Sequence, residues 1–284
     1  MGHHAQADLT ILLMTTENTV TGGSRINHSV CKWCYGDIPL EDLCIAGKAM
    51  GLKSIDLLMP GDFPALRKHG LTCAIVGNPP ATTAAGVAVG TITHAFNRLE
   101  HHDALVAAYQ PHLKATADAG GKLAICFSGN RDGMTDRQGL ENCVTGLKRL
   151  LPTAGKLGVT LVMELLNSKV DHAGYMCDRT AWGVELCERL DNPHFGLLYD
   201  IYHMQIMEGD VIRTIRENHR WFAHYHTGGV PGRNEIDETQ ELNYPAIMRT
   251  IADTGYTGYV AQEFIPKRPD KLASLRQALE RCSV

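Results

Sequence analysis

Short apolar runs alternate with longer amphipathic segments along almost the whole chain, and this alternation constrains the fold more than any other feature. Eight apolar runs of strand length follow Arg25, and they cover residues 26–31, 54–59, 71–77, 122–127, 159–165, 195–200, 221–227 and 259–265. Each run is followed by a segment typical of a helix, at residues 39–51, 63–70, 103–120, 136–158, 180–190, 207–218, 244–255 and 271–282. We expect Pro111 to disturb the third of these helices and Pro152 to bend the fourth.

Strands that read as nearly continuous apolar runs belong to sheets that are covered on both faces, which are parallel sheets. Eight strand–helix units in a chain of 284 residues therefore predict an α/β protein built as a single (β/α)8 TIM barrel. Because the linkers are short and the composition does not shift, we expect one barrel domain over residues 26–284. The exception is the Pro-, Gly- and Ala-rich stretch 77–101, which is long enough to be a functional or mobile loop.

Residues 1–25 do not fit the repeating pattern and are expected to form an N-terminal extension. The extension begins Met-Gly-His-His, as an expression tag would, and it lacks the basic region of an export signal. A trimmed leader is the alternative. No run reaches the roughly 18 apolar residues that a membrane span requires, so we expect no membrane partner and a cytoplasmic location, with export through a removed leader as the alternative.

The charge and the cysteines narrow the function further. The net charge of −4 and the pI of 6.4 leave no basic field that would attract nucleic acid. The nine cysteines are scattered, and several lie inside apolar runs. This pattern favours buried free thiols in a reducing compartment rather than a disulfide framework.

Four consecutive predicted strands end in residues that can bind a metal ion. These residues are Glu164, Asp200, His226 and Glu263. Any one of these residues alone is weak evidence for a metal site. A Glu after a strand is often solvated, and a His on a strand often only makes a hydrogen bond in the core. Since active-site groups of a barrel stand at the carboxyl ends of its strands, we expect these four side chains to meet. Three carboxylates and one imidazole suit Mn²⁺ or Mg²⁺, with Co²⁺, Fe²⁺ or Zn²⁺ as alternatives.

Several motifs of the second half resemble a known family. They are MELLNSK (163–169), YDIYHMQIMEGD (199–210), VPGRNEID (230–237), ELNYPAI (241–247) and GYTGYVAQEFIP (255–266). The chain resembles the xylose isomerase-like TIM barrels, above all the hydroxypyruvate isomerase group and the related sugar isomerases and epimerases. The resemblance extends over most of the chain from about residue 26 and is weaker before residue 120.

The resemblance implies roles for individual residues. It makes Glu164, Asp200, His226 and Glu263 the ligands of a divalent metal, and Glu164 and Glu263 also the acid and base. His203 and Arg233 take the positions of substrate-facing groups, although His203 could equally serve as a supporting hydrogen-bond partner. One position departs from the pattern, because hydroxypyruvate isomerases tend to carry Gln where this chain has His226. A histidine there is usual in the ketose 3-epimerase branch.

The predicted activity is therefore that of a divalent-metal-dependent isomerase acting on a small hydroxy-keto acid or a ketose. The metal would chelate a carbonyl and its neighbouring hydroxyl, and one glutamate would take a proton to give an enediolate. Returning the proton to the neighbouring carbon isomerises the substrate, whereas returning it to the same carbon from the other face makes the protein a ketose 3-epimerase. The resemblance also implies a homo-oligomer, either a dimer or a tetramer.

Two further functions remain open at this point. One is a phosphodiesterase resembling the apurinic endonucleases (endonuclease IV), which share this barrel but need a basic DNA-binding face. The other is a non-catalytic metal-binding barrel, because the fold alone proves no activity.

The stretch INHSVCKWCYGD (26–37) contains a Cys-x-x-Cys pair, Cys31 and Cys34, at the end of the first predicted strand. A structural zinc site needs further Cys or His ligands at matching spacing, and the chain has no second Cys-x-x-Cys. We expect both cysteines to be packing thiols, with redox activity as the alternative. We expect His28 and Trp33 to line the mouth of the pocket as substrate contacts.

Overall fold

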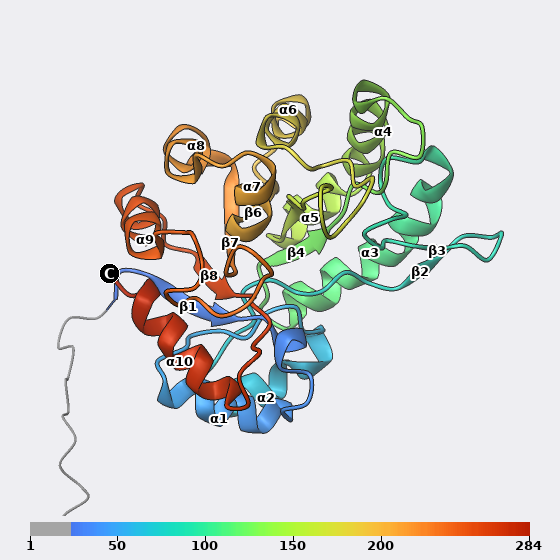
Figure 1. Cartoon of the computed structure of the whole chain (residues 1–284). Coiled ribbons are helices and arrows are strands. Elements are labelled where there is room, and N and C mark those ends of the chain that lie inside the picture. The colour runs from blue at the N-terminus through green and yellow to red at the C-terminus, as the bar shows by residue number, and fades with distance from the viewer. Residues whose placement is uncertain (1–23) are drawn as a thin grey trace, which may run out of the picture.

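The computed structural model describes residues 24–284, so the predicted N-terminal extension lies outside the described residues except for Ser24 and Arg25. The larger of two sheets is parallel and has six strands in the order β1-β8-β7-β6-β5-β4. Its strands are β1 (Asn27–Val30), β4 (Leu123–Cys126), β5 (Thr160–Glu164), β6 (Phe195–Asp200), β7 (Phe222–Thr227) and β8 (Tyr259–Gln262). Figure 1 shows this curled sheet at the centre, with the helices around it.

Two of the eight predicted strands, at residues 54–59 and 71–77, are not strands in the structure. Isolated parallel bridges join these segments to each other and to the sheet, at Cys31–Asp56, Ser54–Thr72, Leu58–Val76 and Val76–Ala124. One physical reason is local. Leu57 has φ 60°, so the first segment cannot continue as extended backbone. The α/β class is confirmed, and the sheet contains six of the eight predicted strands.

The helices follow the predicted order with three differences. The α-helices are α1 (Leu40–Ala49), α2 (Phe63–Lys68), α3 (His102–Asp118), α4 (Asp136–Lys148), α5 (Leu151–Leu157), α6 (Thr180–Leu190), α7 (Ile201–Met207), α8 (Val211–Asn218), α9 (Tyr244–Asp253) and α10 (Lys271–Cys282). The 3-10 helices are η1 (Lys32–Tyr35), η2 (Pro60–Asp62), η3 (Leu99–His101) and η4 (His219–Trp221).

The differences arise at prolines and at Asp200. Helix α3 continues through Pro111, contrary to our expectation. The predicted helix 136–158 is divided into α4 and α5, and Pro152 lies in the first turn of α5, where a missing N–H costs no hydrogen bond. Helix α7 begins directly after β6 because the Asp200 carboxylate caps it by accepting from the backbone N–H of His203 at 3.1 Å.

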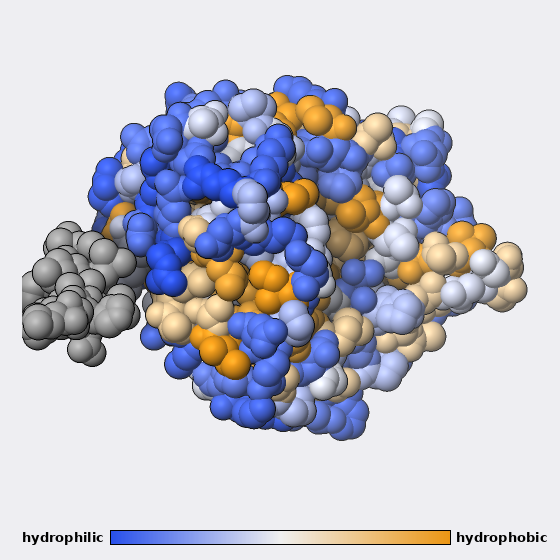
Figure 2. Space-filling model, turned by 60° about the horizontal axis from the view of Figure 1, so that its bottom comes forward, coloured by the Kyte–Doolittle hydropathy of each residue, from blue (hydrophilic) through white to orange (hydrophobic). Residues whose placement is uncertain are grey.

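The stretch 77–101 contains a short antiparallel hairpin, β2 (Ala81–Thr82) and β3 (Ala88–Val89). This hairpin projects from the body of the molecule (Figure 1). Figure 2 shows a face that is mostly hydrophilic, with hydrophobic side chains near its middle and others on the projecting arm. No described helix is long and apolar enough to span a membrane.

Candidate metal and active site

The structure brings the four predicted strand-end residues together. Glu164 and Asp200 are the last residues of β5 and β6, His226 lies near the end of β7, and Glu263 directly follows β8. One ligand atom from each of the four lies within 4.8 Å of the others, and all four side chains are buried. We call this group the strand-end cluster. The parallel register explains the meeting, since β5 to β8 all end at the same edge of the sheet.

The donor set of the strand-end cluster fits a divalent cation. Nδ1 of His226 lies 2.8 Å from Oε2 of Glu263 and 3.4 Å from Oε1 of Glu164. Among the described residues, the Glu164 Oε1 and His226 Nδ1 atoms are buried without a hydrogen-bond partner of suitable geometry. Buried polar atoms that converge without partners are characteristic of a site that accepts a ligand. Carboxylate oxygens with one imidazole are ligands that manganese and similar ions accept.

Arg233 and Trp33 cover the strand-end cluster. The Arg233 guanidinium donates to Glu263 Oε2 and approaches Asp200 Oδ2 at 3.4 Å. Its carbon Cζ lies 5.2 Å from the ring centre of Trp33 and 5.4 Å from that of Tyr202, so the cation is held between two aromatic faces. The Trp33 indole N–H donates to Glu263 Oε1 at 2.8 Å. Arg233 and Trp33, two of the four predicted substrate contacts, therefore reach the cluster.

The charges of the strand-end cluster depend on one another. Burial raises the pKa of Asp200 to about 8, although Arg233 opposes this shift. Burial also raises the pKa of Glu164. For Glu263, burial acts in the same direction, but His226 and Arg233 outweigh it and hold the pKa well below its usual range. Burial would lower the pKa of His226, but Glu263 and Glu164 raise it well above its usual value.

A second polar layer lies beneath the strand-end cluster, and the sequence did not single it out. His224 precedes His226 by two residues on β7, so both side chains point to the same side of the sheet. His224 Nε2 contacts Asp56 Oδ2 at 2.7 Å, and Asp56 Oδ1 accepts from the hydroxyls of Ser29 and Ser54. The His224 and His226 rings meet edge to face, with their centres 5.1 Å apart.

His203 reaches the cluster from helix α7. Its Nε2 lies 3.6 Å from Asp200 Oδ2, and its Nδ1 lies 2.7 Å from the amide nitrogen of Asn167. The side chain is fully buried. Burial lowers the pKa of His203 well below its usual value. From its position in the sequence alone, Asn167 would be given a structural role rather than a role in the site.

His28 does not join the cluster. In the register of β1 and β8 it pairs with Val260, three residues before Glu263, which places it at the opposite end of the strands. Its Nε2 lies 3.1 Å from Ser283 Oγ. The side chain therefore packs near the C-terminus instead of lining the pocket, because β1 has only four residues and His28 stands near its start.

The Cys-x-x-Cys pair lies beside the cluster. All nine cysteines are buried and free, as expected. Cys31 Sγ lies 3.6 Å from His226 Nε2 and within 4.8 Å of a carboxylate oxygen of Glu263. Cys31 is thus more than a packing thiol, and no signal in the sequence beyond its place at a strand end would have shown this contact.

A cavity of about 320 Å³ opens over the strand-end cluster. Its polar wall contains Glu164, Glu263, Arg233, Asn78 and His172. Apolar side chains form much of the remainder, namely Trp33, Leu57, Ile92, Ile125, Phe127 and Leu166. A small polar molecule could enter this cavity and reach both glutamates. His172 and Asn78 come from loops, which is why the strand-based prediction did not include them.

The sequence matches known proteins along most of its length. The family model described as "Xylose isomerase-like TIM barrel" matches residues 64–282. A 2-oxo-tetronate isomerase of Cupriavidus necator is 33% identical over 40% of this chain and 43% of that protein. The 2-oxo-tetronate isomerase of Pectobacterium atrosepticum is 25% identical over 82% of this chain and 89% of that protein. A putative hydroxypyruvate isomerase of Homo sapiens is 31% identical over 37% of this chain and 38% of that protein. The chain thus spans less than half the length of two of these relatives.

Solved structures share the fold. A protein from Brucella melitensis titled an AP endonuclease of family 2 has a TM-score of 0.72 and 25% identity, with 90% of this chain and 96% of that chain covered. A D-psicose 3-epimerase has a TM-score of 0.68 and 16% identity, with 89% and 90% covered. At this low identity, the likeness to the epimerase shows the fold alone.

Proposed function

The chain belongs to the family of xylose isomerase-like TIM barrels, and from this membership we propose that it is a divalent-metal-dependent isomerase of a small hydroxy-keto acid or a ketose. The observation that carries the proposal is the strand-end cluster, in which three buried carboxylates and one imidazole converge within 4.8 Å. Relatives named 2-oxo-tetronate isomerase and putative hydroxypyruvate isomerase support the choice of an isomerase acting on short keto acids.

In this proposal, Glu164, Asp200, His226 and Glu263 hold the cation. A divalent cation supplies positive charge that stabilises the negative charge developing on the substrate oxygens. Glu164 and Glu263 are the two groups that move the proton: one removes it from the carbon beside the carbonyl, and one delivers it to the neighbouring carbon. Arg233 orients the substrate, because its planar guanidinium can bind a carboxylate through two hydrogen bonds. Trp33 and Arg233 together limit the access of water to the carboxylates.

The first experiment measures turnover of hydroxypyruvate, a 2-oxo-tetronate and D-psicose, with added Mn²⁺ and after chelation. We expect turnover of at least one keto acid that is lost on chelation and recovered with Mn²⁺. The variant Glu263→Gln should lose about 10²- to 10⁴-fold in turnover, the usual contribution of a general acid or base. Glu238→Gln makes the same change on an exposed side chain and should keep wild-type turnover. Turnover that survives in Glu263→Gln contradicts the proposed mechanism.

The alternative activity is that of a ketose 3-epimerase. It is favoured by His226, because a histidine at this position is usual in the epimerase branch of the family. The same assay separates the two, since an epimerase converts D-psicose to its C3 epimer and leaves the carbonyl in place. The Brucella structure bears the name of an AP endonuclease, so abasic DNA belongs in the same panel. We expect no cleavage of abasic DNA, because the net charge is −4 and a DNA-binding face needs excess positive charge.

We propose that residues 26–284 form one domain with a closed eight-stranded barrel, in which residues 54–58 and 72–76 take the second and third strand positions. The four isolated parallel bridges between β1 and β4 support this closure. The expected homo-oligomer, the cytoplasmic location, the absence of nucleic-acid partners and the identity of the metal stay predictions.

A further inference from the structure

Asn167 is fully buried in the loop after β5, and its neighbours fix the orientation of its amide. Its Oδ1 accepts hydrogen bonds from the backbone N–H groups of Val170 at 3.0 Å and of Asp171 at 2.9 Å. Both of these partners can only donate. The amide oxygen must therefore occupy this position, and the amide NH₂ group must point the other way.

The NH₂ group of Asn167 consequently faces two acceptors. It donates to Asp171 Oδ2 over 2.6 Å, and it lies 2.7 Å from Nδ1 of His203. Because an amide nitrogen offers only hydrogens, Nδ1 must present its lone pair. A hydrogen on Nδ1 would set one donor against another at this distance. Asp171 Oδ2 lies 3.9 Å from Nδ1, which is too far for it to accept that hydrogen instead.

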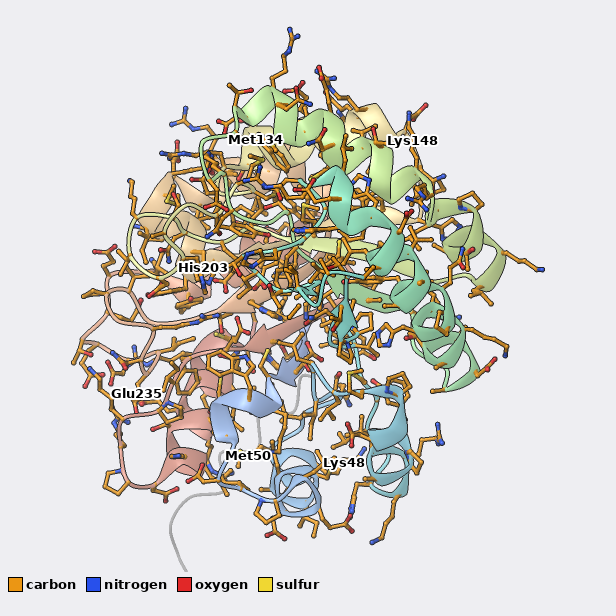
Figure 3. The ribbon with its side chains drawn as sticks, turned by 90° about the vertical axis from the view of Figure 1, so that its right-hand side faces the viewer. Lys48, Met50, Met134, Lys148, His203 and Glu235 are labelled. Atoms are coloured by element: carbon orange, nitrogen blue, oxygen red, sulfur yellow. The ribbon has the colours of Figure 1, made fainter. Side chains whose placement is uncertain are left out.

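Because Nδ1 presents its lone pair to Asn167, the hydrogen of the His203 ring must be on Nε2. This atom is buried and has no hydrogen-bond partner within residues 24–284. It lies 3.6 Å from Asp200 Oδ2, so it faces the strand-end cluster. Figure 3 labels His203, which lies in the first turn of α7. An unpaired buried donor beside such a cluster is available to a ligand.

We infer that Asn167 is a positioning residue that holds His203 in the Nε2–H tautomer, so that the ring presents a hydrogen-bond donor to a substrate oxygen at the strand-end cluster. The part about the substrate rests on the proposed function, whereas the tautomer does not. The partner of one ring nitrogen decides which form the other nitrogen takes. The competing explanation is that Asn167 only ties down the backbone of its loop.

The tautomer can be measured in the wild-type protein without any substitution. Nitrogen-15 NMR of protein with labelled histidines distinguishes a protonated ring nitrogen from an unprotonated one. The His203 signals are assigned by their disappearance in His203→Gln. We expect the shift of an unprotonated nitrogen for Nδ1 and of a protonated nitrogen for Nε2. A hydrogen on Nδ1 in the wild type overturns the inference.

Exchanging the side chains of Asn167 and Asp171 tests the inference without changing the net charge. In the double variant Asn167→Asp with Asp171→Asn, the carboxylate still accepts from the two backbone N–H groups, but its second oxygen faces Nδ1. That oxygen requires a hydrogen on Nδ1, so the tautomer should reverse. Asp171→Asn alone is the matched control, because its amide oxygen still accepts from Asn167, and it should show the wild-type pattern. A double variant that is less stable but keeps the wild-type tautomer contradicts the inference.

Kinetics then test the positioning role. We expect the double variant to lose about 10- to 100-fold in kcat, the usual range for a partner of a site residue, with Mn²⁺ affinity by calorimetry unchanged. Reversal of the tautomer with unchanged kcat overturns the positioning role. If the wild type turns over no substrate of the panel, the proposed function fails, and the NMR spectrum alone still decides whether Asn167 sets the tautomer.

Discussion

His226 directs its two ring nitrogens toward different partners. Nδ1 faces the carboxylates, and Nε2 faces Cys31 Sγ at 3.6 Å. Replacing Cys31 with alanine leaves the buried Nε2 of His226 without this partner, which costs about 1–3 kcal/mol of unfolding free energy. Cys31→Ser keeps a hydrogen-bonding group at this position and should be less destabilised than Cys31→Ala. Urea unfolding of both variants checks this order, and equal stabilities would show that the sulfur makes no useful contact.

His28 predicts an acid-dependent loss of stability. Burial lowers its pKa to about 4, whereas its pKa in the unfolded chain is about 6.5. Between pH 6.5 and pH 4, His28 therefore binds a proton in the unfolded state but not in the folded state. Its contribution to the free energy of unfolding is fully present above pH 6.5 and is lost as the pH falls toward 4, by up to about 3 kcal/mol.

Urea unfolding between pH 7 and pH 4 measures this effect. We expect His28→Gln to reduce the slope of stability against pH in this interval. His219→Gln changes an exposed histidine and should keep the wild-type slope. An unchanged slope in His28→Gln would mean that His28 is as easily protonated in the folded protein as in the unfolded chain.

The ends of parallel strands were predictable residue by residue, but the contacts from loops were not. Glu164, Asp200, His226 and Glu263 meet because the sheet register brings strand ends to one edge. Arg233 reaches them through a left-handed backbone conformation, φ 58°, which nothing in its sequence position requires. The first strand was predicted to within one residue of its ends, but His28 stands near its start, whereas the strand-end cluster lies at the carboxyl ends of the strands.

At the level of elements, helix α9 supports the loop that carries Arg233. The hydroxyl of Tyr244, the first residue of α9, accepts from the Gly228 N–H at 2.8 Å and donates to the Gly228 carbonyl at 2.7 Å. Tyr244→Phe leaves both backbone groups without this partner. We expect a loss of about 1–3 kcal/mol in unfolding free energy and a raised KM, because the loop that positions Arg233 begins at Gly228.

Tyr256→Phe is the matched control for this prediction. The Tyr256 hydroxyl also bonds to the backbone, because it donates to the carbonyls of Ala223 and Tyr259. These carbonyls lie at the start of β7 and β8 rather than at their ends. Tyr256→Phe should lower stability without raising KM. Denaturant unfolding and steady-state kinetics on both variants separate the two effects, and a raised KM in Tyr256→Phe would argue against a specific role of α9.

The order of the elements was predictable, whereas their exact form depended on interactions that are distant in sequence. The 54–59 segment has the apolar pattern of a strand, yet Asp56 turns inward to His224 on β7, 168 residues away. Pro111 is tolerated inside α3, although a proline in a helix interior usually disrupts it. Local patterns indicate such segments correctly but cannot show the tertiary contacts that alter them.

The whole molecule has a core that combines apolar packing with charged groups at one end. Glu164, Asp200, His226 and Glu263 are nearly inaccessible to solvent, and burying charged groups is unfavourable unless they are paired. Arg233 compensates them in part by contacting Glu263 and Asp200. A divalent cation would compensate them further, so folding and metal binding should be linked.

This linkage predicts that metal removal destabilises the whole protein. A ligand that binds only the folded state at 100 times its Kd stabilises it by about 2.7 kcal/mol, so Mn²⁺ should raise the melting temperature and chelation should reverse the rise. Asp200→Asn removes one of the proposed ligand carboxylates and should abolish most of the rise. Glu238→Gln alters an exposed carboxylate and should retain it. Because unfolding is measured without substrate, a rise in Asp200→Asn equal to that of the wild type would place the bound metal outside the strand-end cluster.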